Sequence, residues 1–351
     1  MKKWKGFGAV LATVAIVAVG VFVVARWDLR TLDAEARVAA PGSFVELTDG
    51  FVHYAWHGPD LGEVVVLVHG FSTPSFVWAG IVEPLTRAGF RVLHYDNYGR
   101  GFSDRPHVNN DADLFDRQLV QLLNSQSVEK PVHLVGYSMG GAIATWFAAH
   151  HPERVASMGL IAPAGFPVNV PGVASLLAVP VLGDWLMAVS GKSIILDTMS
   201  LPENQGRALP DIAEMYKEQM EYEGYLRSLL STMRHFPMGA MQVEYEAVGA
   251  AGIPVLAVWG DQDSTVPPGN AKLVERAIPD ARIEMIRGGT HAITYSEPKR
   301  VSAALVEFFL HGSRALRHEA AREPTRFHKR PDLFAPVVVE VIFDASLEHV
   351  A

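Results

Sequence analysis

The feature that most constrains this chain is a five-residue segment, GYSMG at 136–140, that joins two runs of different character. Residues 131–135 form an apolar run, whereas residues 141–149 are mostly small. The first run predicts a buried strand, and the second predicts a closely packed helix. The turn between them needs small residues on both sides of Ser138, because the chain passes so close to itself that larger side chains would collide.

A serine at the top of a strand-to-helix turn is raised above the sheet edge and can act as a nucleophile. The same five-residue pattern also arises by chance, and it is then an ordinary turn of glycine and serine. The flanking strand and helix favour the first interpretation. A nucleophile of this kind requires an acid and a histidine later in the chain, in that order.

Two later strand ends supply these partners. Residues 253–260 predict a buried strand, and Asp261 and Asp263 follow it. Residues 281–286 predict the next strand, which leads into a glycine-rich loop that carries His291. The chain has 14 histidines, so His291 stands out only by its position at a strand end. For the two acids, an aspartate-rich surface turn is the alternative interpretation.

The oxyanion that forms in acyl transfer needs hydrogen-bond donors beside the nucleophile. Residues 63–68 predict a strand that ends at His69 and Gly70, and Phe71 follows. The backbone N–H groups of Phe71 and Met139 are the expected donors of this oxyanion hole. We interpret His69 as a structural residue.

Composition narrows the remaining functions. With 351 residues and 49% hydrophobic content, the chain can bury one large core, so we expect one catalytic domain with appendages. The formal net charge of -8 argues against a nucleic-acid partner. The sequence shows no glycine-rich phosphate loop and no metal-ligand spacing, so we expect no cofactor and no metal. It has no cysteine, which excludes disulfides, a thiol nucleophile and a lipid-bearing cysteine.

The N-terminal residues predict a transmembrane anchor. Residues 6–25 contain no charged side chain, and as a helix they would span about 30 Å, the thickness of the hydrocarbon core of a membrane. Lys2, Lys3 and Lys5 precede them, which places the N-terminus in the cytoplasm and the catalytic domain outside, in the periplasm or the extracellular space. The alternative is a signal peptide that is cleaved near residues 23–25, with secretion of the mature protein.

Strands and helices alternate along the rest of the chain. Residues 43–47 and 51–56 predict a hairpin that opens a mostly parallel sheet flanked by helices, an α/β fold. The strand pattern stops after residues 156–162, and the apolar helical insert that follows is interpreted as a cap after the sixth strand. The predicted organisation is an anchor (1–27), a linker (28–42), an α/β domain (43–311) with its cap at about 164–250, and a C-terminal extension (312–351).

The C-terminal extension differs in composition from the domain before it, because arginine and lysine outnumber the acids at its start. Residues 337–343 have strand propensity but no predicted partner strand. We expect a disordered or loosely docked tail. Contact of its basic residues with a membrane surface is the alternative.

Further motifs give the chain a resemblance to a known family. The segment YDNYGRGFS at 95–103, the His-Gly-Phe turn and the Ser138 segment together resemble the α/β-hydrolase superfamily, over about residues 43–311. The resemblance implies a catalytic triad of Ser138, Asp263 and His291. It favours Asp263 over Asp261, because the acid of this family commonly stands third after the strand's glycine and shortly before Val-Pro.

Within the superfamily, the N-terminal span and the motifs are similar to membrane-anchored monoacylglycerol lipases and bacterial membrane-bound phospholipases. Three departures argue against other branches. Ser138 stands where haloalkane dehalogenases and epoxide hydrolases carry aspartate, and Ala292 stands where ring-cleavage C–C hydrolases usually carry tryptophan. Phe71 interrupts the His-Gly-Gly-Pro loop that is usual in proline iminopeptidases.

The expected function is therefore a serine carboxylester hydrolase, an esterase or lipase that forms an acyl-enzyme. The expected substrate is a small-molecule or lipid ester, such as a monoacylglycerol, a lysophospholipid or a phospholipid. A cofactor-free perhydrolase or acyltransferase would use the same triad and remains an alternative. So does a binding protein that keeps the fold without turnover.

Overall fold

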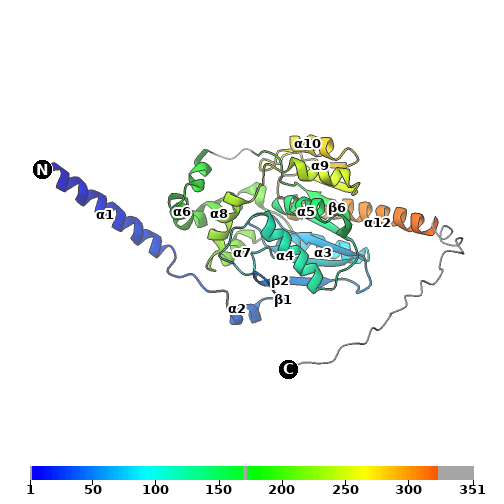
Figure 1. Cartoon of the computed structure of the whole chain (residues 1–351), viewed down its shortest axis with the longest axis horizontal. Coiled ribbons are helices and arrows are strands. Elements are labelled where there is room, and N and C mark those ends of the chain that lie inside the picture. The colour runs from blue at the N-terminus through cyan, green and yellow to red at the C-terminus, as the bar shows by residue number, and fades with distance from the viewer. Residues whose placement is uncertain (1, 169–171, 323–351) are drawn as a thin grey trace, which may run out of the picture. The chain divides into compact units, whose positions relative to one another are not determined.

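The computed structural model describes residues 2–168 and 172–322, with side chains described for residues 11–168 and 175–311. The chain divides into two units, Met1–Leu310 and His311–Ala351. The first unit contains an eight-stranded sheet with helices on both of its faces (Figure 1).

The sheet is parallel except at one edge. Strands β1 and β2 pair antiparallel, as do β2 and β4, and every other neighbouring pair is parallel. The predicted opening hairpin is confirmed, with Leu47 opposite Gly50. In spatial order the strands are β1 (Ser43–Leu47), β2 (Gly50–His57), β4 (Arg91–Tyr95), β3 (Val64–Val68), β5 (Val132–Tyr137), β6 (Val155–Ile161), β7 (Val255–Gly260) and β8 (Arg282–Ile286).

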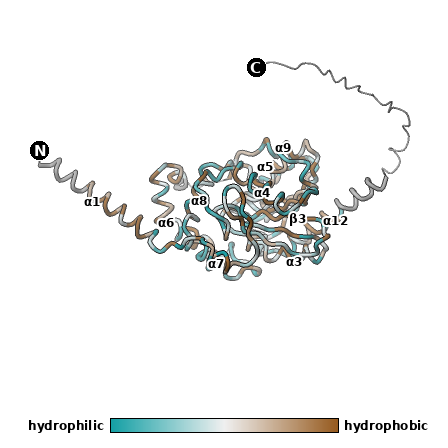
Figure 2. The backbone as a smooth tube through the Cα atoms, turned by 60° about the horizontal axis from the view of Figure 1, so that its bottom comes forward, coloured by the Kyte–Doolittle hydropathy of each residue, from teal (hydrophilic) through white to brown (hydrophobic). Residues whose placement is uncertain are grey.

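Alternate residues of the central strands enter two separate hydrophobic clusters. Val66 and Val68 belong to the cluster on one face of the sheet, whereas Val65 and Leu67 belong to the other, and all four are fully buried. A strand buried on both faces reads as the continuous apolar run seen in the sequence (Figure 2). One face packs against α4 (Ala112–Ser125), α5 (Met139–His150), α9 (Gln242–Ala250) and α10 (Ala271–Ala277), and the other against α3 (Ala79–Arg87), α11 (Ile293–Ser296) and α12 (Pro298–Arg322).

The insert between β6 and β7 is helical and divides into two parts. Its last helix, α9, packs on the sheet, since Tyr245 is buried in the same cluster as α5 and its hydroxyl donates to the Ala164 carbonyl at 2.7 Å. The earlier helices, called the cap below, cover the carboxyl ends of the strands. The cap comprises η3 (Gly172–Ala178), α6 (Leu182–Met199), η4 (Pro202–Asn204), α7 (Ile212–Gln219) and α8 (Tyr225–His235).

The prediction of a transmembrane anchor is wrong, and so is the localisation derived from it. Among the residues with described side chains, no helix is long and apolar enough to cross a membrane. Helix α1 (Lys2–Val24) does form in the predicted stretch. In addition, the Trp185 indole of the cap donates to the Ala18 carbonyl at 2.9 Å, so α1 contacts protein within the stretch assigned to lipid.

The segments on either side of the domain differ in part from expectation. The predicted linker contains a short helix, α2 (Ala34–Ala39), which Asp33 caps by accepting a hydrogen bond from the Ala36 N–H. The last helix, α12, continues past the predicted end at His311 to Arg322. The rest of the C-terminal extension, including the strand-like residues 337–343, lies outside the described residues.

A buried ion pair fixes the loop that follows β4. The Asp96 carboxylate accepts hydrogen bonds from His53 Nδ1 at 2.8 Å, from the Ser75 N–H at 2.8 Å and from the Phe102 N–H at 2.9 Å. The other ring nitrogen of His53 faces the Pro41 carbonyl, which can only accept, so both ring nitrogens must carry protons. Burial opposes both charges, yet the pairing raises the pKa of His53 and holds the pKa of Asp96 well below its usual range.

Replacement of His53 by glutamine should lower the free energy of unfolding by about 3–5 kcal/mol at pH 6, because it removes one partner of a buried ion pair. The folded-state pKa of His53 lies above its ordinary value. This stabilisation is therefore fully present below about pH 6.5 and is lost as the pH rises through the folded-state pKa. Urea unfolding of both proteins at pH 6 and at pH 9 measures the change.

His107→Gln is the matched control, since His107 is exposed, and it should shift the unfolding free energy by less than about 0.5 kcal/mol at either pH. A cost of His53→Gln that stays the same from pH 6 to pH 9 would contradict a charged pair in the folded state.

Candidate active site

Ser138 occupies the sharp turn between β5 and α5. Its φ of 54° and ψ of -120° are unusual for a residue other than glycine, and such strain is common at functional sites. A Cβ atom on Gly136 would lie 2.3 Å from the Gly140 carbonyl oxygen, and one on Gly140 would lie 2.0 Å from the Val68 carbonyl oxygen. The two glycines that flank Ser138 are therefore required by contact between backbones, as the sequence suggested.

The structure brings three of the predicted site residues into one hydrogen-bonded line. His291 Nε2 lies 3.0 Å from Ser138 Oγ, and His291 Nδ1 lies 2.8 Å from Asp263 Oδ2. The Asp263 side chain is fully buried, and its other oxygen accepts from the N–H groups of Thr265 at 2.9 Å and Val266 at 2.8 Å. The carboxylate thus has a fixed orientation, and Nδ1 is the nitrogen that donates to it.

Asp261, the other candidate acid, lies in a different place. Its carboxylate accepts from the Gly288 N–H at 2.7 Å, at the exposed start of the loop that carries His291. It makes no bond to His291, among the hydrogen bonds of the described residues. Asp261 therefore shapes the loop, whereas Asp263 meets the imidazole.

Tyr137, the residue before the serine, contacts His291 through both its ring and its hydroxyl. The two rings lie 5.2 Å apart between centroids, and the tyrosine hydroxyl donates to the His291 carbonyl at 3.0 Å. Burial raises the pKa of Tyr137 well above its usual range, so the hydroxyl keeps its proton for this bond. Sequence reasoning gave Tyr137 no role, because the variable position of a motif carries no signal about what it contacts.

His69 orients the backbone beside Ser138. Its Nδ1 lies 2.9 Å from the Gly70 carbonyl, and its Nε2 accepts from the Asn97 N–H at 2.8 Å. Burial lowers the pKa of His69 to about 4, so the ring is neutral and carries its one proton on Nδ1. Since C=O and N–H point in opposite directions across a trans peptide, the bond to the Gly70 carbonyl aims the Phe71 N–H away from His69.

The two predicted oxyanion donors, Phe71 and Met139, both have backbone N–H groups free to bind a ligand. Neither N–H has an acceptor among the residues that the structure describes. Met139 is the first residue of α5, where a helix leaves its N–H groups without partners inside the helix. A Cβ on Gly70 would lie 3.4 Å from Ser138 Cβ, so the Gly70–Phe71 peptide lies against the serine.

Arg100 holds the next peptide of the same loop. Its side chain is fully buried and donates to the Phe71 carbonyl at 2.8 Å, to the Tyr98 carbonyl at 3.0 Å and to Thr232 Oγ1 of α8 at 2.8 Å. It forms no salt bridge with any carboxylate in the described part of the chain, and burial lowers its pKa to about 9. Arg100 therefore links the oxyanion loop (residues 69–73) to the cap. The sequence showed the motif that contains Arg100 but not this link.

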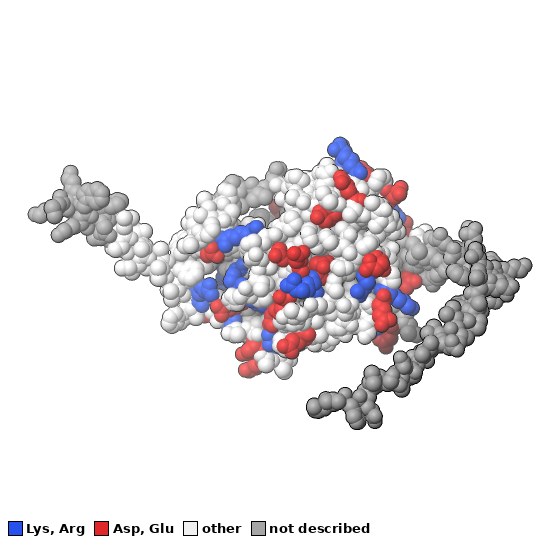
Figure 3. Space-filling view, in the orientation of Figure 1, with Lys and Arg blue, Asp and Glu red and all other residues white. Residues whose placement is uncertain are grey.

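Within the described residues, no group of three or more His, Asp or Glu side chains could hold a metal ion. On the face shown in Figure 3, acidic and basic side chains are mixed, and no large patch of one sign is visible.

Comparison with known proteins identifies the family. A family model described as the alpha/beta hydrolase fold matches residues 63–298. A 2-hydroxy-6-oxononadienedioate/2-hydroxy-6-oxononatrienedioate hydrolase from Cupriavidus pinatubonensis is 28% identical over 293 residues, which cover 77% of this chain and 96% of the relative. Lipase 3 from a Moraxella species is 27% identical over 241 residues, 68% of this chain and 74% of the lipase.

Solved structures agree on the fold. The enol-lactonase from Burkholderia xenovorans LB400 superposes with a TM-score of 0.65 at 21% identity, over 76% of this chain and all of the lactonase. The relatives do not show the narrower likeness to membrane-anchored monoacylglycerol lipases or membrane-bound phospholipases. The prediction of an enzyme, a serine hydrolase of the ester-cleaving kind, is confirmed by the hydrolases and esterases among the relatives. The chain belongs to the alpha/beta hydrolase fold family.

Proposed function

We propose that this protein hydrolyses carboxylic esters through an acyl-enzyme on Ser138, with His291 as general base and Asp263 as its partner. The observation that carries the proposal is the continuous line of hydrogen bonds from Ser138 Oγ through both nitrogens of His291 to Asp263. A serine hydroxyl is a weak nucleophile until a base takes its proton, and this geometry supplies that base.

The reaction follows from these positions. The proton of Ser138 passes to His291 Nε2 while Oγ attacks the ester carbonyl carbon, and the carbonyl oxygen becomes an oxyanion held by the N–H groups of Phe71 and Met139. Collapse of this intermediate breaks the bond to the alcohol, which leaves with the proton from Nε2. Water then attacks the acyl-enzyme with His291 again as base, and the free acid departs.

Asp263 makes proton transfer to His291 favourable. When His291 becomes an imidazolium, the buried carboxylate at 2.8 Å stabilises its charge, and the two backbone donors on Asp263 keep that carboxylate from turning away. The same bond keeps Nε2 as the unprotonated nitrogen in the resting enzyme. Both effects come from the position of Asp263, and neither requires its carboxylate to take up a proton.

An ester with an extended acyl chain is the substrate class we propose. With the membrane anchor excluded, its support is the apolar character of α6 and the relative named as a lipase. Hydrolysis of a dienedioate at a carbon–carbon bond is a second candidate, favoured by the relatives that carry this name. Such a substrate is a dianion, however, and the buried Arg100 beside Phe71 already donates to three acceptors.

Purified full-length protein should hydrolyse p-nitrophenyl esters and monoacylglycerol, with kcat/KM rising from acetyl to octanoyl esters because longer chains bury more apolar area. Initial rates over a series of acyl lengths, with lysophospholipid and the dienedioate as further substrates, measure this. Activity confined to short water-soluble esters would contradict a lipid ester. Turnover of the dienedioate alone would replace ester hydrolysis with the second candidate.

Ser138→Ala and Asp263→Asn should each lower kcat by about 10⁴-fold or more, because both remove a member of a unit that acts together. Alanine tolerates the backbone at this position no worse than serine, so thermal unfolding of Ser138→Ala should match that of the wild type. Two neighbours provide controls. Ser264→Ala and Asp261→Asn change the same loop region and should alter kcat by less than threefold. A large loss of kcat in Asp261→Asn would instead identify Asp261 as the catalytic acid.

His69→Phe should lower kcat by about 10²–10³-fold with little change in KM, the loss expected for one misplaced oxyanion donor. The backbone donor itself cannot be deleted, but the bond that orients it can. Steady-state kinetics with an ester that the wild type turns over separates the two constants. A rise in KM at constant kcat would show that His69 acts on substrate binding and not on the oxyanion.

A further inference from the structure

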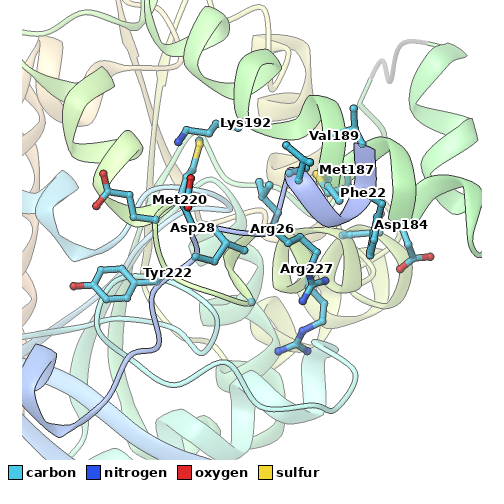
Figure 4. Close-up of a pocket in the computed structure, with 18 of the residues that line it drawn as sticks. Phe22, Arg26, Asp28, Asp184, Met187, Val189, Lys192, Met220, Tyr222 and Arg227 are labelled. Atoms are coloured by element: carbon cyan, nitrogen blue, oxygen red, sulfur yellow. The ribbon is translucent and has the colours of Figure 1, made fainter. Parts of the chain in front are cut away.

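A cavity of about 540 Å³ lies between the N-terminal segment and the cap (Figure 4). Its walls come from the end of α1 and the turn after it, from α6, and from residues 220–230. Ser138, Asp263 and His291 do not line it. Its volume falls in the range of about 300–1,000 Å³ that is typical of small-molecule sites.

Helix α8 separates this cavity from the oxyanion loop. Leu226 and Leu230 line the cavity, whereas Tyr225 and Thr232 point to the hydrolase core, where they bond to the Ser72 carbonyl at 2.8 Å and to Arg100 at 2.8 Å. Residues on opposite faces of one helix cannot share a pocket. The cavity is therefore a second site and not an extension of the catalytic cleft.

Most of the cavity wall is apolar. Phe22 and Leu29 come from the N-terminal segment, Met187 and Val189 from α6, and Leu226 from α8. The pale blue N-terminal ribbon and the pale green cap helices face each other across it in Figure 4. Methionine adapts its shape easily, so this wall suits a flexible hydrocarbon chain.

Two guanidinium groups stand at one part of the cavity. Arg26 and Arg227 both line it (Figure 4), and they are close enough for the charge of Arg26 to act on Arg227. One carboxylate, Glu223, lies 2.9 Å from Arg26. Arg227 donates only to the main-chain carbonyls of Arg105 and Pro106, at 2.7 and 3.1 Å, and forms no salt bridge within the described residues.

Arg26 and Arg227 thus bring two positive charges to this part of the cavity, and Glu223 brings one negative charge. Of the acids that line the cavity, Asp184 pairs with Arg234 at 3.0 Å and Glu221 pairs with Arg30 at 3.3 Å. The remaining two charged lining residues, Asp28 and Lys192, add one charge of each sign. An arginine has five N–H donors, and Arg227 uses two of them. A carboxylate would meet free donors and relieve the repulsion between the two guanidinium groups.

We propose that this cavity binds a single-chain fatty acid, with its carboxylate at Arg26 and Arg227 and its hydrocarbon chain along the apolar wall. The proposal goes beyond ester hydrolysis and does not depend on it. It assigns a ligand to a site that the catalytic mechanism leaves unused.

Isothermal titration of dodecanoate into the full-length Ser138→Ala protein tests the proposal, because binding in this variant is measured without turnover. We expect saturable binding with one equivalent, at least tenfold tighter than that of dodecyltrimethylammonium, which has the same chain and the opposite charge. Failure of ester hydrolysis in the wild type would leave this result unaffected. Absence of saturable binding, or equal affinity for the two amphiphiles, would overturn the proposal.

Two variants locate the ligand. Arg26→Gln should weaken dodecanoate binding at least tenfold, whereas Arg87→Gln, which also removes an exposed ion pair but touches no residue of the cavity wall, should change it less than twofold. Ala188→Trp should fill the cavity and block binding, with Ala303→Trp on the exposed side of α12 as its control. Unchanged affinity in both Arg26→Gln and Ala188→Trp would place the fatty acid elsewhere and refute the site.

Discussion

The contact between the backbones of Gly140 and Val68 is the constraint on which the site depends. It holds the first turn of α5 against the end of β3, at a separation that leaves no room for a Cβ atom. The serine, the proposed oxyanion donor at the start of α5 and the proposed donor after β3 therefore have fixed relative positions before any side chain contributes. Because both donors belong to the backbone, their spacing is set by the packing of the fold and not by flexible side chains.

The buried side chains of His53, Asp96, His69 and Asp263, which lie around this contact, all have hydrogen-bond partners. His53 and Asp96 form an ion pair, whereas His69 is held neutral by burial between a backbone donor and a backbone acceptor. Asp263 meets two N–H groups as well as His291. A buried polar group without a partner costs about 1–3 kcal/mol, so this network also selects one arrangement of the loops.

Short-range patterns predicted the sheet, its opening hairpin, the turn at Ser138 and the two strand ends that carry Asp263 and His291, because periodicity and glycine placement act over a few residues. Contacts between distant segments left no such signal: Arg100 and Thr232 stand 132 positions apart, and neither is unusual where it stands. The same limit explains the error at the N-terminus. The sequence pattern of an uncharged apolar run is the same for a helix that contacts the cap and for a helix in lipid. The bond from Trp185 to Ala18 joins positions far apart in the chain, so no short-range pattern could predict it.

Hydrogen bonds join the cap to the oxyanion loop directly, from Tyr225 to the Ser72 carbonyl and between Tyr216 and the Ser72 hydroxyl. Arg100 adds an indirect link, since it bonds to both Thr232 and the Phe71 carbonyl. Each of these hydrogen bonds contributes about 0.5–1.5 kcal/mol to stability. Those that involve the cap would all have to break if α7 and α8 moved together. A displacement of these helices would break the hydrogen bonds that they make to the loop that carries Phe71. The position of the Phe71 N–H, one of the two proposed oxyanion donors, is therefore tied to the position of the cap as well as to the sheet.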